Sequence, residues 1–308
     1  MTKDCSATLR KLVKNPVAAV PANEVVDWGL EALGVPGLWS MTRGEGIKIG
    51  VIDTGADLKH TDLVGAIADS RTFGVRDGAE AWDHIGHGTH VCGIIAARDN
   101  NQGIIGVAPR SKLYIAKVLD CEEDLDADVI AEAIDWCVEK GVDIINISLA
   151  LYDGSDALEE AVERAVEANV AIVAAAGNEG NYQDFICYPA KYRGVLCVGS
   201  VDRNRKLSPT SSVGNRLDLL APGEEIYSTF PLGIYAKLSG TSMACPFVTG
   251  IAALVLARHR DYKPVSTTPC DTPAQLREHL LASATPIKTA ESVNYTGFRV
   301  INPDGAKA

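Results

Sequence analysis

Three segments of this chain carry residue types that together could perform acyl transfer. Asp53 ends the apolar run VIDTG, His87 lies in the glycine-rich stretch DHIGHGTHVCGIIAA, and Ser242 opens the apolar stretch SMACPFVTGIAALVLA. A serine hydroxyl is a weak nucleophile near neutral pH, so it needs an adjacent base, and that base needs an orienting acid. The pattern therefore predicts Ser242 as nucleophile, His87 as general base and Asp53 as the orienting carboxylate.

The elements expected around these side chains suit that chemistry. A carboxylate at the end of a buried strand is held rigidly, and the glycine turn before His87 lets the backbone approach a substrate. Ser242 stands at the start of a helix, where free N–H groups and the helix dipole favour a developing oxyanion. Each motif alone also fits a structural role, such as a capped turn or a helix start. The three motifs together, in this order, favour a catalytic role over a structural one.

Short apolar runs alternate with helical patterns along the chain. The β-branched runs, bounded by glycines or polar turns, predict buried strands. They are residues 46–54, 112–119, 142–150, 169–177 and 194–201. Residues 126–140 and 155–169 repeat apolar residues at helical spacing, and Ser155 is the expected N-cap of the second helix. This alternation predicts an α/β fold, with a mostly parallel central sheet and helices on both faces.

The composition excludes several classes of protein. The chain has 308 residues, of which 46% are hydrophobic and 22% charged, as in ordinary globular proteins. A net charge of −11 argues against nucleic acid and anionic membranes as partners. The first twenty residues are polar and charged, so we expect no signal peptide and no membrane span. The eight scattered cysteines are then expected to be free thiols of a cytoplasmic protein.

The chain resembles the subtilisin-like serine proteases, the subtilase family, over nearly its whole length. The matching stretches include VIDTGADLKHTDL, GHGTHVCGIIAA, GIIGVAPRSKLYIAKVL, VAAAGNEG and LSGTSMACPFVTG. The resemblance implies the three-layer subtilisin-like fold and the family's catalytic order of Asp, His and Ser. It also implies that the Asn178 amide and the Ser242 backbone N–H form the oxyanion hole, and that His90 is a packing residue. Cys92, Cys245 and Phe247 are expected to be buried.

The resemblance further implies that a peptide substrate binds as an added strand between two segments of the enzyme. The residues expected to contact it are Ser148, Leu149, Ala150, Glu123, Leu125, Glu179 and Cys187. Ala150 stands where the family usually has glycine, so its methyl group would narrow the primary pocket unless a small backbone shift absorbs it. The acidic stretch 121–128 would attract basic substrate residues, or it is simply a solvated loop before a helix.

Two cation sites are implied by the same resemblance. A structural Ca²⁺ would be held by oxygen ligands. These are the side chains of Glu24, Asp62 and Asn100 and the backbone carbonyls of Arg98, Gln102 and Ile104. A weaker, monovalent site would use the carbonyls of Ala190, Tyr192 and Val195 near Asp218.

The layout is most similar to that of the intracellular subtilisins. We expect residues 1–22 to form an N-terminal extension, either inhibitory or a flexible tail, and residues 23–308 to form the peptidase domain. Residues 261–275, rich in Pro and Thr, predict a surface loop. The predicted function is a serine endopeptidase acting on proteins or peptides, with a homodimer as an option. The alternatives are a dedicated processing protease for peptide precursors and a catalytically silent binding module, which the intact triad disfavours.

Overall fold

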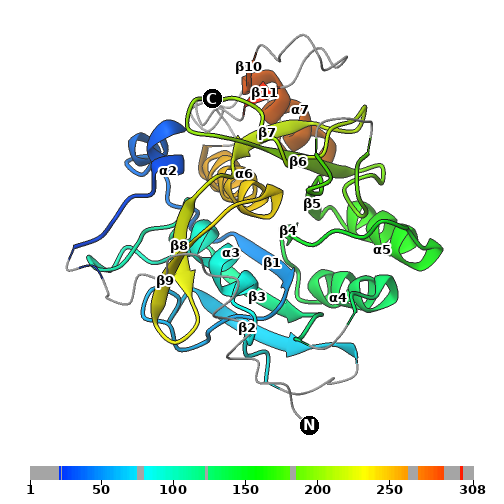
Figure 1. Ribbon diagram of the computed structural model, residues 1–308, viewed down its shortest axis with the longest axis horizontal. Helices are drawn as coiled ribbons and strands as arrows, with labels where there is room; N and C mark the ends of the chain where they lie inside the picture. The colour runs from blue at the N-terminus through cyan, green and yellow to red at the C-terminus, as the bar shows by residue number, and fades with distance from the viewer. Residues whose placement is uncertain are drawn as a thin grey trace.

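The computed structural model describes residues 21, 23–74, 80–121, 124–180, 185–262, 270–287 and 299–300. Within these ranges the chain forms a central sheet with helices on both faces, and a separate two-stranded hairpin (Figure 1). The expected α/β architecture is confirmed. The expected extension at residues 1–22 lies outside the described residues, apart from Pro21.

The central sheet grows outward from strand β1 in both directions. Its order is β10-β11-β7-β6-β5-β4-β1-β3-β2, and every neighbouring pair is parallel except β10 and β11. The strands are β1 (Lys48–Asp53), β2 (Ile67–Thr72), β3 (Lys112–Lys117), β4 (Ile144–Ile147), β5 (Ala171–Ala175), β6 (Val195–Val201), β7 (Leu219–Pro222), β10 (Thr285–Pro286) and β11 (Arg299–Val300). Because the direction of growth changes at β1, its carboxyl end opens a crevice where ligands bind in such sheets.

Two buried clusters lie on the two faces of the sheet. Helices α3 (His87–Ala96) and α6 (Thr241–Tyr262) belong to one cluster, and α4 (Ala127–Glu139) and α5 (Asp156–Glu167) to the other. Successive residues of a strand point to opposite faces, so Val51 joins the first cluster and Ile52 the second. The expected N-cap of α5 is confirmed, since the Ser155 side chain accepts a hydrogen bond from the Leu158 N–H.

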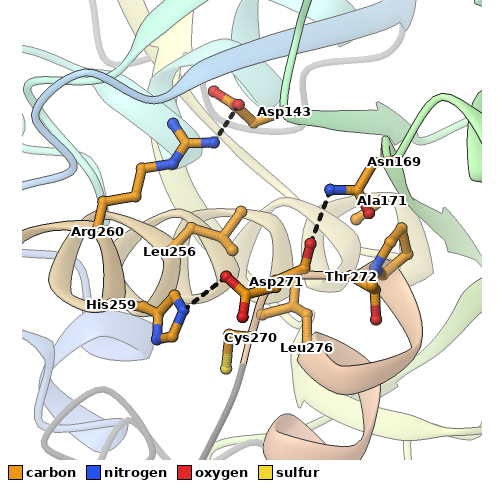
Figure 2. Close-up of a pocket in the computed structure, with 11 residues that line it drawn as sticks. Asp143, Asn169, Ala171, Leu256, His259, Arg260, Cys270, Asp271, Thr272 and Leu276 are labelled. Carbon is orange, nitrogen blue, oxygen red and sulfur yellow. Dashed lines mark hydrogen bonds and ion pairs between the residues drawn. The ribbon is translucent and has the colours of Figure 1, made fainter. Parts of the chain in front are cut away.

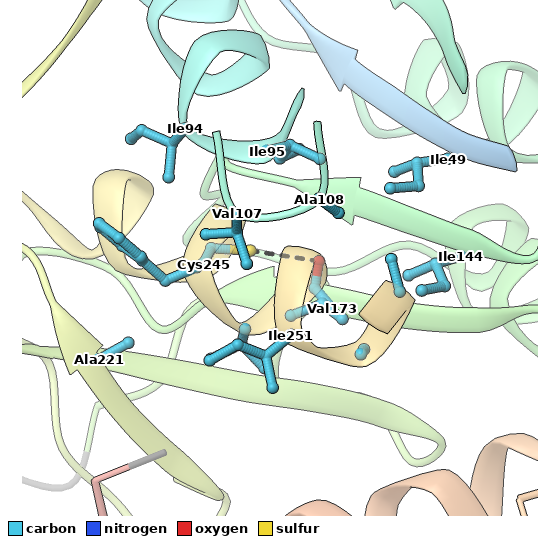
Figure 3. Packing of buried hydrophobic residues seen from close by; sticks show 14 of the residues in the cluster. Ile49, Ile94, Ile95, Val107, Ala108, Ile144, Val173, Ala221, Cys245 and Ile251 are labelled. Carbon is cyan, nitrogen blue, oxygen red and sulfur yellow. Dashed lines mark hydrogen bonds between the residues drawn. The ribbon is translucent and has the colours of Figure 1, made fainter. Parts of the chain in front are cut away.

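Helix α6 runs through the centre of the first cluster (Figure 3). Its length and hydropathy would suffice to cross a membrane. However, 89% of an 18-residue apolar window within Thr241–Asp261 is buried inside the protein, so it is a core helix. The Cys245 thiol lies 3.4 Å from the carbonyl of Val173 and is fully buried, as are Cys92 and Phe247. Their expected burial is confirmed, and the cysteines in the described part of the chain are all free.

The hairpin of β8 (Ile226–Phe230) and β9 (Ile234–Leu238) is fastened to α3. The hydroxyl of Thr229 donates to the carbonyl of Thr89 at 2.7 Å. His90 Nε2 lies 2.9 Å from the Ile226 carbonyl and 3.2 Å from that of Ala236. Burial lowers the pKa of His90 to about 3, so the ring is neutral and Nε2–H donates to both strands. His90 is therefore a packing residue, as expected, and it also joins the hairpin to the helix.

The remaining helices are α2 (Trp28–Ala32), the 3₁₀ helix η1 (Val35–Leu38) and α7 (Pro273–Ser283). The expected loop at residues 261–275 is wrong at both ends, because α6 continues through Tyr262 and α7 already begins at Pro273. Thr272 caps α7 and exchanges hydrogen bonds with Gln275 in a capping box, and proline suits the first turn. Residues 263–269, in between, lie outside the described residues.

Candidate active site

Asp53 and His87 form a hydrogen-bonded pair at the carboxyl end of β1. Asp53 is fully buried, and its Oδ1 lies 2.7 Å from His87 Nδ1 and 2.8 Å from the Thr54 backbone nitrogen. A carboxylate can only accept, so the imidazole carries its proton on Nδ1 and leaves Nε2 free to accept one. The second oxygen, Oδ2, is buried without a hydrogen-bond partner among the described residues. The pair is therefore arranged as an orienting acid and a general base.

The electrostatics of the pair favour a protonated imidazole. Burial alone lowers the pKa of His87, because it penalises the charged ring. The charge of Asp53, its hydrogen bond and the charge of Asp83 outweigh this effect, and the net pKa is raised above the ordinary value of 6.5. The surroundings of His87 therefore stabilise its imidazolium form.

Asp83 holds the loop that carries His87, and the sequence analysis missed it. Its fully buried carboxylate accepts hydrogen bonds from the backbone of Gly86 at 2.7 Å and Thr89 at 2.8 Å, and from the hydroxyl of Thr54 at 2.9 Å. The loop before α3 is thus tied to the end of β1. Gly86 has φ 96°, and a Cβ there would collide with the ring of Phe230. The sequence does contain a signal for this role: an aspartate shortly before a helix often accepts hydrogen bonds from the backbone N–H groups of its first turn.

Ser242 and Asn178 meet at the opening of α6. The Thr241 backbone N–H donates to Asn178 Oδ1 at 3.0 Å. Because a backbone N–H can only donate, the amide oxygen must face Thr241, and the amide NH₂ points elsewhere. His87, Asn178 and Ser242 line one cleft. Its other lining residues are Thr54, Ile85, Leu119, Leu149, Phe230, Lys237, Leu238, Ser239 and Met243.

The segment after β4 forms part of this cleft. Leu149 lines the cleft, and Ala150 beside it is exposed. Ser148 is buried, and its hydroxyl accepts from the amide of Asn146 at 3.0 Å, so its side chain stabilises the segment. Leu151 exchanges two backbone hydrogen bonds of 2.9 Å with Tyr188. The segment is therefore held at both ends of its exposed stretch.

Glu179 and Cys187 differ sharply in exposure. The exposed Glu179 accepts a hydrogen bond of 2.8 Å from the Tyr152 hydroxyl, which raises the pKa of Tyr152. Cys187 is buried against Gly177, and burial followed by the charge of Glu179 raises its pKa to about 11. The thiol is therefore neutral and acts as packing. Leu125 packs, half-buried, against the cluster of α4 and α5, and Glu123 lies outside the described residues.

The residues expected to bind calcium are brought together. Asp62 is fully buried, and it accepts hydrogen bonds from the Asn100 amide at 3.0 Å and from the backbone of Ile104 at 2.8 Å. The strand before α2 reaches the same loop, since the Val25 N–H donates to the Gly103 carbonyl at 2.8 Å. This contact places Glu24 beside the loop of residues 98–104, which carries the remaining expected ligands Arg98 and Gln102.

Glu24 supplies the observation that fits a cation. One of its carboxylate oxygens is buried and has no hydrogen-bond partner among the described residues. Burial, followed by the negative charges of Asp99 and Asp62, raises the pKa of Glu24, although a hydrogen bond from Asn101 and the charge of Arg43 oppose the rise. A buried carboxylate oxygen without a partner, under the influence of two further carboxylates, suits a hard cation such as Ca²⁺. In the described ranges no group of three or more His, Cys, Asp or Glu side chains could hold a metal, so the expected calcium site would depend on two carboxylates together with amide and carbonyl oxygens.

The second expected cation site does not fit this chain. The guanidinium of Arg216 donates to the carbonyls of Lys191 at 3.2 Å, Tyr192 at 2.7 Å and Val195 at 3.4 Å. Asp218 is paired with Arg277. Two of the three carbonyls expected to bind a monovalent ion, those of Tyr192 and Val195, therefore already accept from a cation that belongs to the protein. The expectation of a monovalent ion is therefore wrong, because the Arg216 side chain occupies its place.

A second concavity lies at the opposite ends of the same strands (Figure 2). Asp143, which precedes β4, pairs with Arg260 at 2.5 Å, and Asp271 lies 3.3 Å from His259 Nε2. The Asn169 amide donates to the Asp271 carbonyl at 2.7 Å. These pairs join the end of α6 and the start of α7 to the sheet. The concavity is thus a structural junction.

Comparison with known proteins agrees with this geometry. Residues 44–298 match the profile described as the subtilase family. Subtilisin DY of Bacillus licheniformis is 41% identical over 266 residues, covering 86% of this chain and 92% of that protein. An intracellular serine protease of Paenibacillus polymyxa is 43% identical over 233 residues, covering 74% of this chain and 72% of that protein. The major intracellular serine protease of Bacillus subtilis is 40% identical, covering 88% of this chain and 86% of that protein.

The family profile matches most of the chain, and these relatives share 40% or more of the aligned residues with it. The chain belongs to the subtilase family, and it is a serine protease.

The Asp53–His87 pair predicts the pH dependence of peptide hydrolysis. His87 must be neutral to accept a proton, so kcat/KM should rise as pH increases through its raised pKa, with a midpoint above 6.5. In Asp53→Asn the charge and its hydrogen bond are lost. We expect kcat to fall by about 10⁴-fold and the midpoint to move to lower pH. Steady-state rates between pH 5 and pH 9 measure both effects, and an unchanged midpoint would contradict the account.

The Arg216 cluster predicts stability without a monovalent ion. Arg216→Gln should lower the free energy of unfolding by about 1–3 kcal/mol, since it removes charge-assisted hydrogen bonds. The freed carbonyls could then bind K⁺. Urea unfolding in KCl and in tetramethylammonium chloride, with Ser242→Ala as background to prevent autolysis, compares the two proteins. K⁺ should stabilise only the Arg216→Gln variant. If K⁺ stabilises the protein with Arg216 and not the variant, Arg216 does not take the place of the ion.

Proposed function

We propose that this serine protease is an endopeptidase whose catalytic groups are Ser242, His87, Asp53 and Asn178. The observation that supports it is the hydrogen bond of 2.7 Å between Asp53 and His87 behind a cleft that Ser242 and Asn178 also line. In acylation, Ser242 Oγ attacks the scissile carbonyl while His87 Nε2 takes its proton. The C–N bond then breaks, and His87 gives the proton to the leaving amine.

Deacylation repeats the same steps with water. His87 removes a proton from the attacking water, the acyl–oxygen bond to Ser242 breaks, and the proton returns to the serine oxygen. Asp53 orients the ring and stabilises the imidazolium throughout. Its burial keeps water away from the Asp53–His87 hydrogen bond, so the charge interaction is not weakened by solvent.

Asn178 is proposed to stabilise the oxyanion of both tetrahedral intermediates. With its oxygen held by Thr241, its NH₂ is the group left to donate, and the Ser242 backbone N–H at the helix opening is the second donor. Asn178→Leu removes one donor. Losses of about 10²–10³-fold in kcat are typical of such changes.

Covalent labelling tests whether the chain is an enzyme at all. A fluorophosphonate probe should label the full chain, and Ser242→Ala should abolish the labelling without changing the far-UV circular dichroism spectrum. Ser239→Ala, in the same cleft, is the matched control and should label normally. Labelling that persists in Ser242→Ala would overturn the proposed nucleophile. A wild-type chain that is folded but neither labels nor cleaves casein would favour the binding module.

The substrate is proposed to be an extended protein or peptide segment with basic residues before the scissile bond. Asp124 and Asp126 are exposed on the loop that precedes α4, and Asp128 is exposed in the first turn of α4. This segment follows Leu119, which lines the cleft. Asp120, in contrast, is buried beside Lys117, whose ammonium lies 3.0 Å away, and its pKa is lowered to about 2. Asp120 is thus paired within the protein, and the exposed aspartates are the groups that would attract basic substrate residues. A narrow preference of this kind would suit a processing protease.

Profiling with a peptide library tests this preference. We expect Lys and Arg to be enriched before the scissile bond, and Asp124→Asn with Asp126→Asn to reduce the enrichment about two- to five-fold, since exposed charge pairs are weak. Glu159→Gln with Glu163→Gln on α5 removes the same charge away from the cleft and should change nothing. A wild-type profile without such enrichment would exclude the basic preference.

Calcium is proposed as a structural ion bound by the Glu24, Asp62 and Asn100 side chains, with the carbonyls of residues 98, 102 and 104. When bound, it would neutralise the repulsion between Glu24, Asp62 and Asp99 and tie the strand before α2 to the loop after α3. The Asn100 amide donates its NH₂ to Asp62, so its oxygen would turn toward the ion on binding. The ion has no part in the reaction.

Removal of calcium should therefore destabilise the fold without changing the chemistry. In Ser242→Ala, calcium at 100 times its dissociation constant should add about 2.7 kcal/mol to the free energy of unfolding. Glu24→Gln should reduce this gain, and Glu167→Gln, an exposed control on α5, should not. Thermal unfolding with calcium or a chelator measures the gain, and isothermal titration calorimetry measures binding. Equal Tm values in both solutions would exclude the site.

The cellular setting is proposed from the relatives. Two of the similar proteins are named intracellular serine proteases, and a cytoplasmic location agrees with the free thiols. Residues 1–22 are proposed as an inhibitory extension, so their deletion should raise peptidase activity. A homodimer is part of the same proposal, and sedimentation at several concentrations measures it.

A further inference from the structure

Lys237 is a charged residue of the cleft that the mechanism leaves unused. It lies on β9, is exposed, and lines the catalytic cleft. It also lines an adjoining open groove formed by Val25, Val26, Asp27, Trp28, Glu31, Arg203 and Tyr227. Within the described ranges its ammonium has no ion pair or hydrogen bond. Lys237 therefore lines both concavities and has no partner among the described residues.

The geometry places Lys237 on the leaving-group side of the scissile bond. The hairpin lies beside the His87 loop, since a Cβ on Gly86 would collide with the ring of Phe230. His87 must reach the amine that departs with the second half of the substrate. The acyl half would lie instead along Leu149 and Leu119, which follow strands β4 and β3 of the central sheet and line the same cleft. Lys237, on the hairpin, therefore lies on the side of the cleft that the residues after the scissile bond would occupy.

The backbone of Lys237 is fixed at several points. Lys237 pairs with Tyr227 across the hairpin, and the carbonyl of Ala236 before it accepts from the His90 ring at 3.2 Å. The tip of the hairpin is tied down as well, because Asp57 accepts from the backbone of Leu232 at 3.0 Å. The charge is consequently carried by a rigid wall, and only the lysine side chain has freedom to follow a ligand.

We propose that Lys237 makes this protease favour Asp or Glu at the first two positions after the scissile bond. The inference rests on the proposed endopeptidase function and deepens it. The Lys237 side chain is exposed and has no partner among the residues that the structure describes, so it is available to pair with a substrate carboxylate. The opposite rim carries exposed aspartates, so the cleft is acidic before the scissile bond and basic after it. A substrate of the opposite polarity is aligned in one direction only.

Matched peptides that differ at one position test this inference. Each shares a fixed sequence before the scissile bond and carries Asp, Asn or Lys at the first or second position after it. At low ionic strength the full-length enzyme should cleave the Asp peptide about two- to five-fold better than the Asn peptide in kcat/KM. The advantage should shrink in 1 M NaCl, where charges are screened within about 3 Å. Lys237→Gln should abolish it, and Lys237→Glu should favour the Lys peptide.

The controls separate this inference from the proposed function. Lys206→Gln removes the same charge outside the cleft, and it should keep the preference for Asp. Hydrolysis of the Asn peptide, dependent on Ser242, shows that the protease function holds whatever the preference. If the Asn and Asp peptides are cleaved equally by the wild type, or if Lys237→Gln keeps the difference, Lys237 has no such role. Absence of cleavage of every peptide would instead count against the endopeptidase itself.

Discussion

A single buried contact, between the carboxylate of Asp53 and the ring of His87, constrains the arrangement of the whole cleft. A carboxylate without solvent is costly unless donors surround it. Here those donors are His87 and the backbone of Thr54. Asp53 ends β1, the strand from which the sheet grows both ways, so its position is set by paired strands on either side. His87 must come to this fixed point, and the fully buried Asp83 holds the start of α3 there.

The other functional groups follow from the order of the sheet. Strands β1, β4 and β5 are neighbours and parallel, so the residues after their carboxyl ends lie side by side. Asp53, the segment of Leu149 and Asn178 occupy these three positions. Helix α6 then arrives from a distant part of the sequence, and the hydrogen bond from Thr241 to Asn178 fixes where Ser242 stands. The apolar length of α6 anchors this opening in the core. The order of the strands and the position of α6 thus determine which residues line the cleft.

The sequence predicted those features that carry a local signal. Asp53, His87 and Ser242 lie in short motifs, and the strands are continuous apolar runs, so both could be recognised without tertiary information. Arg216 could not, because its partners are backbone carbonyls that leave no mark in the sequence. Lys237 belongs to the cleft only because α3 holds the hairpin. Helix α7 was missed because Thr272 and Pro273 are typical both of loops and of helix starts.

The most direct test of this account is the titration of His87 by nuclear magnetic resonance. The protein is labelled with ¹⁵N-histidine in the Ser242→Ala background, which prevents autolysis, and its ring resonances are followed with pH. Asp53 and Asp83 should hold the pKa of His87 above 6.5, with the proton on Nδ1 in the neutral ring, and Asp53→Asn should lower that pKa. A His87 pKa at or below the ordinary value, unaffected by Asp53→Asn, would contradict the central role of this pair.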